Sequence, residues 1–203
     1  RPRHRRRYKR CCNLGRRTAS AERSRLPFPE ADSAALRPHP DAESGEHRAT
    51  LAETLETLSR NVYVNIELTN YSSPRDRLPE MAAALVEKMS LQSSVLFSSF
   101  LPGNLHRVKR MMPDARLAML AYPGIMGWIG RGWIGRRAAP AIVHPYREDV
   151  GPDYIQREHR LGRRIHAWTV DSPNEAKAFL LMGIDGLISD DPPAMLRVIE
   201  ELR

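Results

Sequence analysis

Hydrophobic and polar positions are distributed very differently in two parts of the chain. From residue 50 onward, short runs rich in β-branched residues alternate with stretches in which apolar residues recur every three or four positions. The first pattern is typical of buried strands and the second of amphipathic helices. Residues 1–49 show neither period, and prolines interrupt them at positions 2, 27, 29, 38 and 40. We therefore predict a disordered or irregular segment over residues 1–49 and a folded domain over residues 50–203.

Six strands are predicted in the folded part, over residues 62–68, 94–100, 117–120, 141–144, 165–170 and 186–189. The helices between them are predicted from their caps. Thr50-Leu51-Ala52-Glu53 has the spacing of a capping box, and so does Ser172-Pro173-Asn174-Glu175, whose helix should end at Gly183. Ser73-Pro74 predicts the start of the second helix, with a proline in its first turn. The apolar stripe expected on that helix is Leu78, Ala82, Leu85 and Met89.

Regular alternation of strands and helices predicts an α/β fold with a parallel sheet and right-handed crossovers. An open Rossmann-like sheet and a (β/α)8 barrel both fit this pattern. The sequence contains neither Gly-x-Gly-x-x-Gly nor Gly-x-x-x-x-Gly-Lys after a predicted strand, which removes the main argument for a nucleotide-binding sheet. A (β/α)8 barrel needs about 250 residues, so we expect a barrel that is incomplete at its N-terminal units.

The positive charge is concentrated in the first quarter of the chain. The 203 residues carry 32 Lys+Arg against 24 Asp+Glu, a net charge of +8, while residues 1–49 alone hold 13 basic and 6 acidic side chains. These basic residues form either a phosphate-binding arm or a non-native leader, such as one translated from a wrong start or through a frameshift. Nucleic acid is not the expected partner, because the folded part is almost neutral and the segment has only Tyr8 and Phe28 as aromatics.

The sequence shows no sign of a transmembrane segment, a secretory leader or a disulfide framework. No apolar run reaches the roughly 18–20 residues that span a bilayer, and residues 1–49 contain no apolar segment of the secretory type. Cys11 and Cys12 are adjacent, a spacing that suits neither a disulfide framework nor a zinc site. We therefore expect a cytoplasmic protein without a transmembrane segment.

Candidate functional residues lie at the carboxyl ends of the predicted strands, where barrel enzymes place their sites. Glu67 is the most informative, because a carboxylate on an otherwise apolar strand is costly to bury unless it meets a cation, hydrogen-bond donors or the barrel mouth. The alternative is an outward-facing Glu67 in a salt bridge. His144 ends another strand and is a candidate for lining the pocket.

Four segments resemble, in order and spacing, the glycerophosphodiester phosphodiesterase family. They are Val-Asn-Ile-Glu-Leu at 64–68, Val-Leu-Phe-Ser-Ser-Phe at 95–100, Ala-Trp-Thr-Val-Asp at 167–171 and Gly-Ile-Asp-Gly-Leu-Ile-Ser-Asp-Asp-Pro at 183–192. The resemblance covers about residues 50–203. It implies a TIM barrel of the PLC-like phosphodiesterase type. It also implies hydrolysis of glycerophosphodiesters to an alcohol and glycerol 3-phosphate, with a divalent metal, Mg²⁺ or Ca²⁺.

The resemblance also implies roles for individual residues. Glu67 matches a metal-binding carboxylate, Ser99 and Phe100 match residues that line the pocket, and Trp168 matches the tryptophan that packs against the glycerol part of the substrate. Two substrate-binding positions depart from the family. Thr69 stands where the family usually has a lysine that contacts phosphate, and Asp171 stands where it usually has asparagine. A lost cation and a gained anion both weaken phosphate binding.

The family's pair of catalytic histidines and its two other metal carboxylates have no counterpart that we identify. His4-Arg5, His39-Pro40-Asp41 and His47-Arg48 are treated as chance matches. We therefore expect a truncated or inactive version of the enzyme, with a metal held weakly if at all. The alternative is a catalytically dead barrel whose basic arm binds anionic lipid or nucleic acid. The loop with Trp128 and Trp133 either touches lipid headgroups or packs on the barrel rim.

Overall fold

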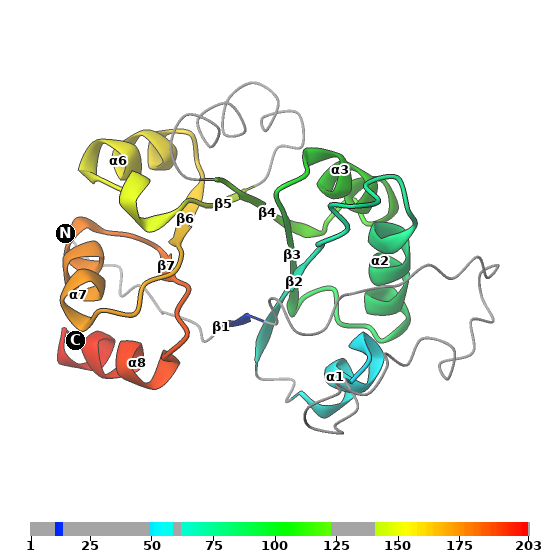
Figure 1. Cartoon of the computed structure of the whole chain (residues 1–203), viewed down its shortest axis with the longest axis horizontal. Coiled ribbons are helices and arrows are strands. Elements are labelled where there is room, and N and C mark those ends of the chain that lie inside the picture. Colours follow the sequence, from blue (N-terminus) through cyan, green and yellow to red (C-terminus); the bar gives the residue numbers. More distant parts are fainter. Residues whose placement is uncertain (1–10, 14–48, 59–61, 123–140, 203) are drawn as a thin grey trace.

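The computed structural model describes residues 11–13, 49–58, 62–122 and 141–202. Within these ranges the strands form one parallel sheet whose order follows the sequence (Figure 1). They are β1 (Cys11–Asn13), β2 (Tyr63–Glu67), β3 (Val95–Ser99), β4 (Arg116–Leu120), β5 (Ile142–His144), β6 (Arg164–Ala167) and β7 (Gly186–Leu187). The sheet curves into an arc, as expected for part of a (β/α)8 barrel.

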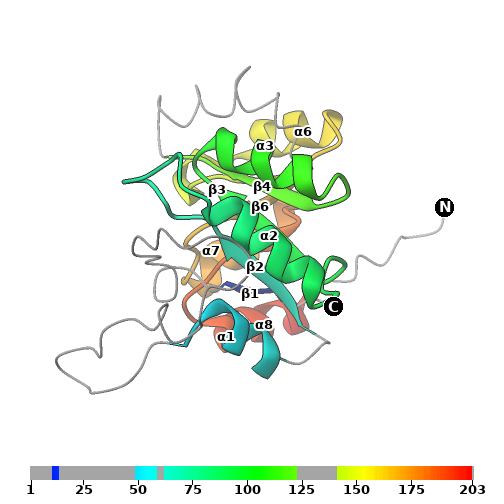
Figure 2. The same ribbon diagram turned by 90° about the vertical axis from the view of Figure 1, so that its right-hand side faces the viewer.

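The helices lie on the outer side of this arc (Figures 1 and 2). They are α1 (Leu51–Thr57), α2 (Leu78–Lys88), α3 (Pro102–Met111), α6 (Pro152–Arg160), α7 (Pro173–Met182) and α8 (Pro192–Glu201), with a short 3-10 turn η1 (Arg147–Asp149). Each βα step leads to the next parallel strand of the sheet. The predicted fold class, an incomplete (β/α)8 barrel, is therefore confirmed.

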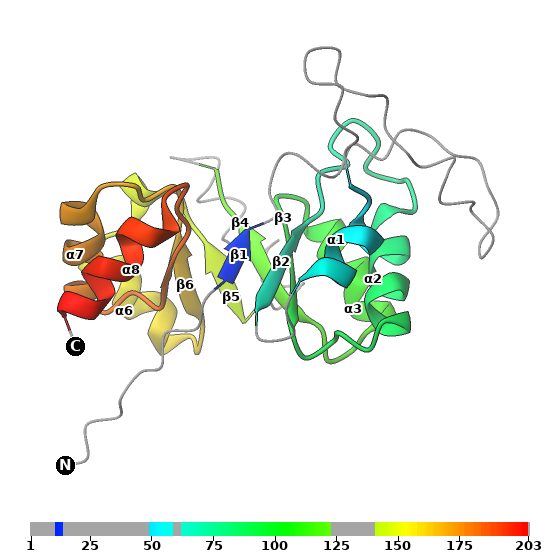
Figure 3. The same ribbon diagram turned by 90° about the horizontal axis from the view of Figure 1, so that it is seen from below.

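Two hydrophobic clusters hold the helices against the sheet. One lies between β2, β3 and β4 and helices α1, α2 and α3, with Phe97 and Leu105 among its buried members. The other joins β5 and β6 to α6, α7 and α8 around Ile165 and Val170. Figure 3 shows the two groups of helices on opposite sides of the strands. The strand-to-helix interfaces are thus the apolar core, which leaves the inner face of the arc for the site.

Strand β1 lies inside the segment that the sequence predicts to be irregular. Its backbone pairs in parallel with β2, with Cys11 opposite Tyr63 and Asn13 opposite Asn65. Three residues are too few to show a period of two, so the hydrophobic pattern gives no signal for this strand. The described ranges contain no pairing between β7 and β1, so the arc is not closed there.

The predicted helix caps are confirmed in two of three cases. Thr50 and Glu53 form the capping box, and the Ser172 hydroxyl accepts a hydrogen bond from the Glu175 amide at 3.5 Å. The second box is incomplete, because the Glu175 carboxylate pairs with Arg147 instead of reaching back to Ser172. Gly183 ends α7 with a φ of 90°, a conformation that glycine adopts without a steric penalty.

The predicted start of the second helix at Ser73-Pro74 is wrong. Helix α2 begins at Leu78, and Pro79 occupies its first turn. The Asp76 carboxylate accepts hydrogen bonds from the Ser73 hydroxyl at 2.9 Å and the Leu78 amide at 3.1 Å, and these bonds fold residues 73–77 into a turn. The side chains of α2 that are fully buried are Pro79, Ala82, Ala83 and Val86, whereas three members of the predicted stripe are only partly buried.

In the part of the chain that the structure describes, no helix is both long enough and apolar enough to cross a bilayer.

Candidate active site

The inner face of the arc is identified by the residues that do not face the helices. Val64 and Ile66 of β2 belong to the hydrophobic cluster under α1, α2 and α3. Side chains alternate across a strand, so Asn65 and Glu67 point to the opposite, inner face. The same alternation places on the inner face Ser98 of β3, Leu120 of β4, His144 of β5, and His166 and Trp168 of β6 and its extension.

Glu67 ends β2 on this inner face and is half-buried. The Tyr71 hydroxyl donates a hydrogen bond to its Oε1 at 3.0 Å. Burial and the nearby Glu67 charge both raise the pKa of Tyr71 far above its ordinary value, so the phenol keeps its proton and remains a donor. Glu67 therefore lies at the barrel mouth, and the outward-facing alternative does not match this placement.

Aromatic rings gather beside Glu67. Tyr71 meets the edge of Phe100 with ring centroids 6.0 Å apart, and Phe100 meets the edge of Trp168 at 5.8 Å. Tyr122 stacks on Phe100 at 4.1 Å, and Tyr146 contacts Trp168 at 5.3 Å. The structure thus brings Glu67, Phe100 and Trp168 together, as the sequence predicts. Tyr71 and Tyr146 were missed, although each closely follows a predicted strand.

Backbone groups of β5 and of the residues that follow it hold Trp168 in place. Its indole Nε1 donates to the His144 carbonyl oxygen at 2.8 Å, and its own carbonyl accepts from the Arg147 amide at 2.8 Å. The isolated bridge between Tyr146 and Trp168 extends the pairing of β5 and β6 beyond the two strands. The ring orientation of Trp168 is therefore fixed by backbone contacts as well as by its aromatic neighbours.

His144 and His166 form a pair below Trp168. Their rings stack with centroids 5.1 Å apart, and His144 Nε2 lies 3.2 Å from His166 Nδ1. His144 is fully buried, whereas His166 keeps part of its surface open but has protein atoms on most sides. Gly186 makes room for this pair, since a Cβ there would lie 2.6 Å from His166 Cδ2. His144, the predicted pocket residue, thus lies beneath the mouth and supports Trp168 through its carbonyl.

Burial lowers the pKa of both histidines. The pKa of His144 falls well below its usual range, and that of His166 falls to about 4, with Arg164 lowering it further and Asp185 opposing the shift. Between pH 6.5 and about 4 the unfolded chain therefore binds a proton that folded His166 does not. The stability that neutral, folded His166 contributes is therefore fully present above about pH 6.5 and is lost as the pH falls towards 4.

We expect His166 to contribute about 2 to 3 kcal/mol to this loss of stability between pH 7 and pH 4. The measurement is urea unfolding at several pH values for the wild type and for His166→Gln. The variant should show a shallower fall of unfolding free energy across this window. His106→Gln, at an exposed position of α3, is the matched control and should keep the wild-type slope. Equal slopes for wild type and His166→Gln would contradict the assignment.

Ser99 faces the helices rather than the inner face. Its hydroxyl donates to the Leu68 carbonyl at 2.9 Å and accepts from the Leu101 amide at 3.1 Å and from Asn104 Nδ2 at 3.1 Å. Thr69 follows Glu67 in the β2–α2 loop and is half-buried, with its carbonyl accepting from the Tyr71 amide. The pocket roles of Ser99 and Thr69 stay predictions.

Asp171 is exposed after β6. Its Oδ1 accepts from the Ser189 hydroxyl at 2.9 Å and the Asp190 amide at 2.8 Å, which ties the segment after β6 to the segment after β7. The amide oxygen of an asparagine is able to accept both bonds, so the distinctive effect of aspartate is its negative charge. Its substrate-binding role stays a prediction.

The described residues do not by themselves fit a hard divalent cation. No three His, Cys, Asp or Glu side chains within the described ranges come together as a metal site. Ca²⁺ takes about six to eight oxygen ligands, and Mg²⁺ takes about six, usually one or two carboxylates together with waters and substrate phosphates. The predicted ligand Glu67 supplies one carboxylate. No step of a reaction is therefore assigned to a metal here.

Several predicted features lie outside the described residues. They are the aromatic loop with Trp128 and Trp133, the basic residues of the proposed arm, and the histidines at positions 4, 39 and 47. The predictions attached to these residues stay predictions.

Known proteins match both the sequence and the fold. A sequence profile of the glycerophosphoryl diester phosphodiesterase family matches residues 13–194. The chain belongs to this family. The resemblance inferred from the four strand-end motifs is therefore confirmed. The family match begins ahead of the domain boundary predicted at residue 50, and its first matched residue lies in β1.

Curated relatives in the family are distant in sequence. The glycerophosphodiester phosphodiesterase of Caldanaerobacter subterraneus is 24% identical over 160 residues, which cover 78% of this chain and 64% of that protein. The glycerophosphodiester phosphodiesterase of Bacillus altitudinis is 28% identical over 158 residues, which cover 75% of this chain and 63% of that protein. The chain thus spans less than two thirds of the length of these two relatives.

Solved structures show the same fold. A phosphodiesterase from Oleispira antarctica, solved in complex with the product sn-glycerol-3-phosphate, superposes with a TM-score of 0.66 and 21% identity, covering 77% of this chain and 63% of that one. A glycerophosphodiester phosphodiesterase from Parabacteroides distasonis gives a TM-score of 0.66 at 20% identity, covering 79% of this chain and 68% of that one. These similarities support the barrel architecture.

Proposed function

We propose that the chain binds glycerophosphodiesters at the carboxyl ends of β2 to β6, and that this site serves their hydrolysis to an alcohol and glycerol 3-phosphate. The observation that carries the proposal is the convergence of Glu67, Phe100 and Trp168 at one end of the arc, linked through Tyr71. Barrels of this type place their sites at that end. The family membership and the product-bound neighbour from Oleispira antarctica support the same substrate class.

Each residue has a proposed part in binding. The Trp168 ring, fixed by its bond to the His144 carbonyl, packs against the glycerol carbons, and Phe100 covers their other side. Glu67, held by Tyr71, faces the polar end of the substrate. Thr69 and Asp171 replace a cation and a neutral amide of the family's pattern, so phosphate is held less tightly.

The hydrolytic step adds water across one P–O bond, with the proton of water passing to the leaving alcohol. It requires one group to activate the water and one to protonate the alcohol. His144 is buried and hydrogen-bonded within its pair, so we assign neither role to it. We propose that the described residues form the substrate-binding part of the site. The ion, Mg²⁺ or Ca²⁺, and the cytoplasmic location are carried over as predictions from the sequence.

Calorimetric titration with sn-glycerol 3-phosphate tests the proposal. We expect saturable binding to the purified chain, and we expect Trp168→Ala to weaken it about five- to ten-fold, because the variant exposes the glycerol carbons to water. Trp168→Phe keeps a ring at this position and should weaken binding less. Circular dichroism should show that both variants remain folded.

Tyr63→Leu is the matched control, because Tyr63 begins β2 at the opposite end of the barrel, where Arg116 lies over its ring. It should bind glycerol 3-phosphate as the wild type does. Wild-type binding by folded Trp168→Ala, or no binding by the wild type, would contradict the proposed function.

A further inference from the structure

Helices α6 and α7 end in turns of the same geometry. At the end of α6 the Gly162 amide donates to the His159 carbonyl at 2.9 Å, and the next amide donates to the Glu158 carbonyl at 3.0 Å. At the end of α7, Gly183 and the residue after it make the two equivalent bonds, both at 3.1 Å. The two glycines have positive φ, 74° at Gly162 and 90° at Gly183. These are Schellman motifs, which fix the backbone where a helix ends.

A large apolar side chain precedes the glycine in each turn and stays exposed. Leu161 is 48% exposed and Met182 is 37% exposed, and Leu181, one residue earlier in α7, is 72% exposed. None of the three belongs to the two hydrophobic clusters that the described residues form. Because hydrogen bonds fix the backbone of both turns, the fold itself holds these side chains in solvent.

A side-chain contact joins the two turns. His159 Nε2 lies 2.7 Å from Asp185 Oδ2, and the same oxygen accepts from the Ile165 amide at 3.1 Å. His159 lies two residues before Leu161, and Asp185 lies three residues after Met182. The exposed apolar side chains therefore share one end of the barrel, where β6 and β7 begin. Single exposed apolar residues are ordinary, whereas a group of them indicates an interaction surface.

Arginines flank this apolar group. Arg160 ends α6 and Arg164 begins β6, both are exposed, and neither pairs with an acidic side chain among the described residues. Glu158, the acidic residue of the same turn, is buried and already pairs with the two other arginines of residues 157–164. Positive charge around Leu161 is therefore left without a partner in the described structure.

Exposed apolar side chains next to unpaired cations suit an anionic lipid surface. We propose that Arg160, Leu161, Arg164, Leu181 and Met182, which we call the basal patch, bind an anionic phospholipid bilayer. The arginines meet lipid phosphates, and the apolar side chains enter the headgroup region. A bilayer accepts separate projecting side chains, whereas a stable protein partner needs a continuous complementary surface of about 1,000 Å² or more.

The proposed contact has a defined orientation. Glu200 and Glu201 at the end of α8 are exposed and repel anionic lipid, so the side of α6 and α7 faces the bilayer. The candidate active site lies at the opposite, carboxyl ends of the strands and stays open to water. The proposal therefore stands or falls independently of the proposed function.

Vesicle flotation with the purified chain tests the lipid contact. At low salt, phosphatidylcholine vesicles with about 30% phosphatidylserine should bind the chain at least about ten-fold more tightly than phosphatidylcholine alone. Raising the ionic strength to about 0.5 M should weaken this binding at least about ten-fold. Equal binding to the two kinds of vesicle would overturn the proposal. Absence of binding to the anionic vesicles would overturn it as well, and would favour an acidic protein as the partner of the patch.

Variants locate the contact on the basal patch. Leu161→Ser combined with Leu181→Ser should weaken binding to the anionic vesicles about five- to ten-fold, because two apolar side chains no longer leave water. Arg160→Gln combined with Arg164→Gln should weaken it about ten-fold and reduce its dependence on salt. Circular dichroism verifies that both double variants are folded.

The matched controls lie on other surfaces. Met111→Ser replaces an apolar side chain that is 39% exposed at the end of α3, and Arg75→Gln removes an exposed cation from the β2–α2 loop. Both should bind the anionic vesicles as the wild type does. Wild-type binding by both folded patch variants would place the contact elsewhere, for example on the basic residues of 1–49, and would overturn the proposal.

Discussion

Purified chain should hydrolyse glycerophosphocholine at least about a hundred-fold more slowly than a family member that carries both catalytic histidines, with Mg²⁺ or Ca²⁺ present. The loss of one acid or base group typically lowers the rate by about 10²–10⁴. Among the described residues, no group of three His, Cys, Asp or Glu side chains forms a metal site, and the two histidines of the inner face stack on each other. The assay is the release of glycerol 3-phosphate.

Glu67→Gln serves as the internal control for this expectation. If Glu67 only binds substrate, the variant should leave the already low rate unchanged at saturating substrate. Robust turnover that Glu67→Gln removes would contradict the expectation. It would show that residues outside the described ranges complete a metal site around Glu67.

Replacing Asn104 by leucine should cost about 2 to 4 kcal/mol of unfolding free energy. Asn104 is fully buried on α3, and its Nδ2 donates to Asn70 Oδ1 at 2.6 Å and to Ser99 Oγ at 3.1 Å. Leucine fills a similar volume but donates no hydrogen bond, so the buried Asn70 oxygen loses its donor. Urea unfolding measures the loss, and His106→Leu on the same helix should change stability by about 0.5 kcal/mol or less.

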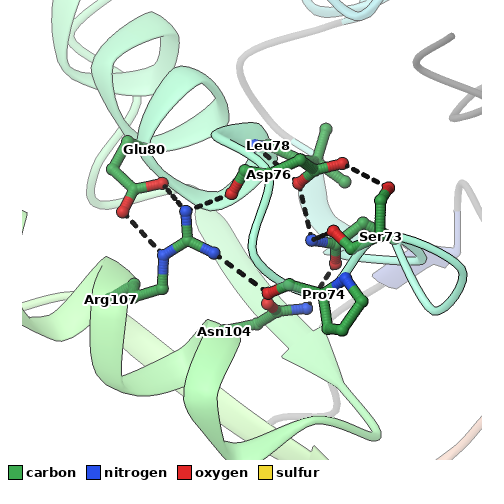
Figure 4. A network of polar contacts seen from close by, with 8 residues as sticks. Ser73, Pro74, Asp76, Leu78, Glu80, Asn104 and Arg107 are labelled. Carbon is green, nitrogen blue, oxygen red and sulfur yellow. Dashed lines mark hydrogen bonds and ion pairs between the residues drawn. The ribbon is translucent and has the colours of Figure 1, made fainter. Parts of the chain in front are cut away.

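Asn104→Leu should also disturb the candidate active site. Figure 4 shows the network in which Asn104 and Arg107 of α3 hold the β2–α2 loop. Arg107 pairs with Glu80 and donates to the carbonyl oxygens of Pro74 and Asp76. Asn70 also lies in this loop, and the next residue is Tyr71, which holds Glu67. Asn104→Leu with wild-type stability would contradict the role given to this network.

The barrel could be predicted because its pattern is local. The strand over 63–67 alternates helix-facing Val64 and Ile66 with inner-face Asn65 and Glu67, and the cap residues Thr50 and Ser172 act within three positions of themselves. These features depend on period and on short-range hydrogen bonds, which a single sequence displays. The order of the strands then follows from the alternation with helices.

The remaining features depend on contacts between distant segments. The turn over 73–77 is stabilised by Arg107, on another helix, which donates to its carbonyl groups in addition to the local hydrogen bonds of Asp76. His144 and His166 are 22 positions apart and meet only when β5 pairs with β6. Strand β1 is defined by its pairing with β2. None of these contacts leaves a periodic signal in the sequence.

A crystal structure of the chain with sn-glycerol 3-phosphate would locate the substrate-binding site. We predict that the ligand lies at the carboxyl ends of β2 to β6, with its glycerol carbons within about 4 Å of the Trp168 ring and its polar end towards Glu67. Ligand bound at another surface, with the mouth between Glu67 and Trp168 left empty, would contradict it.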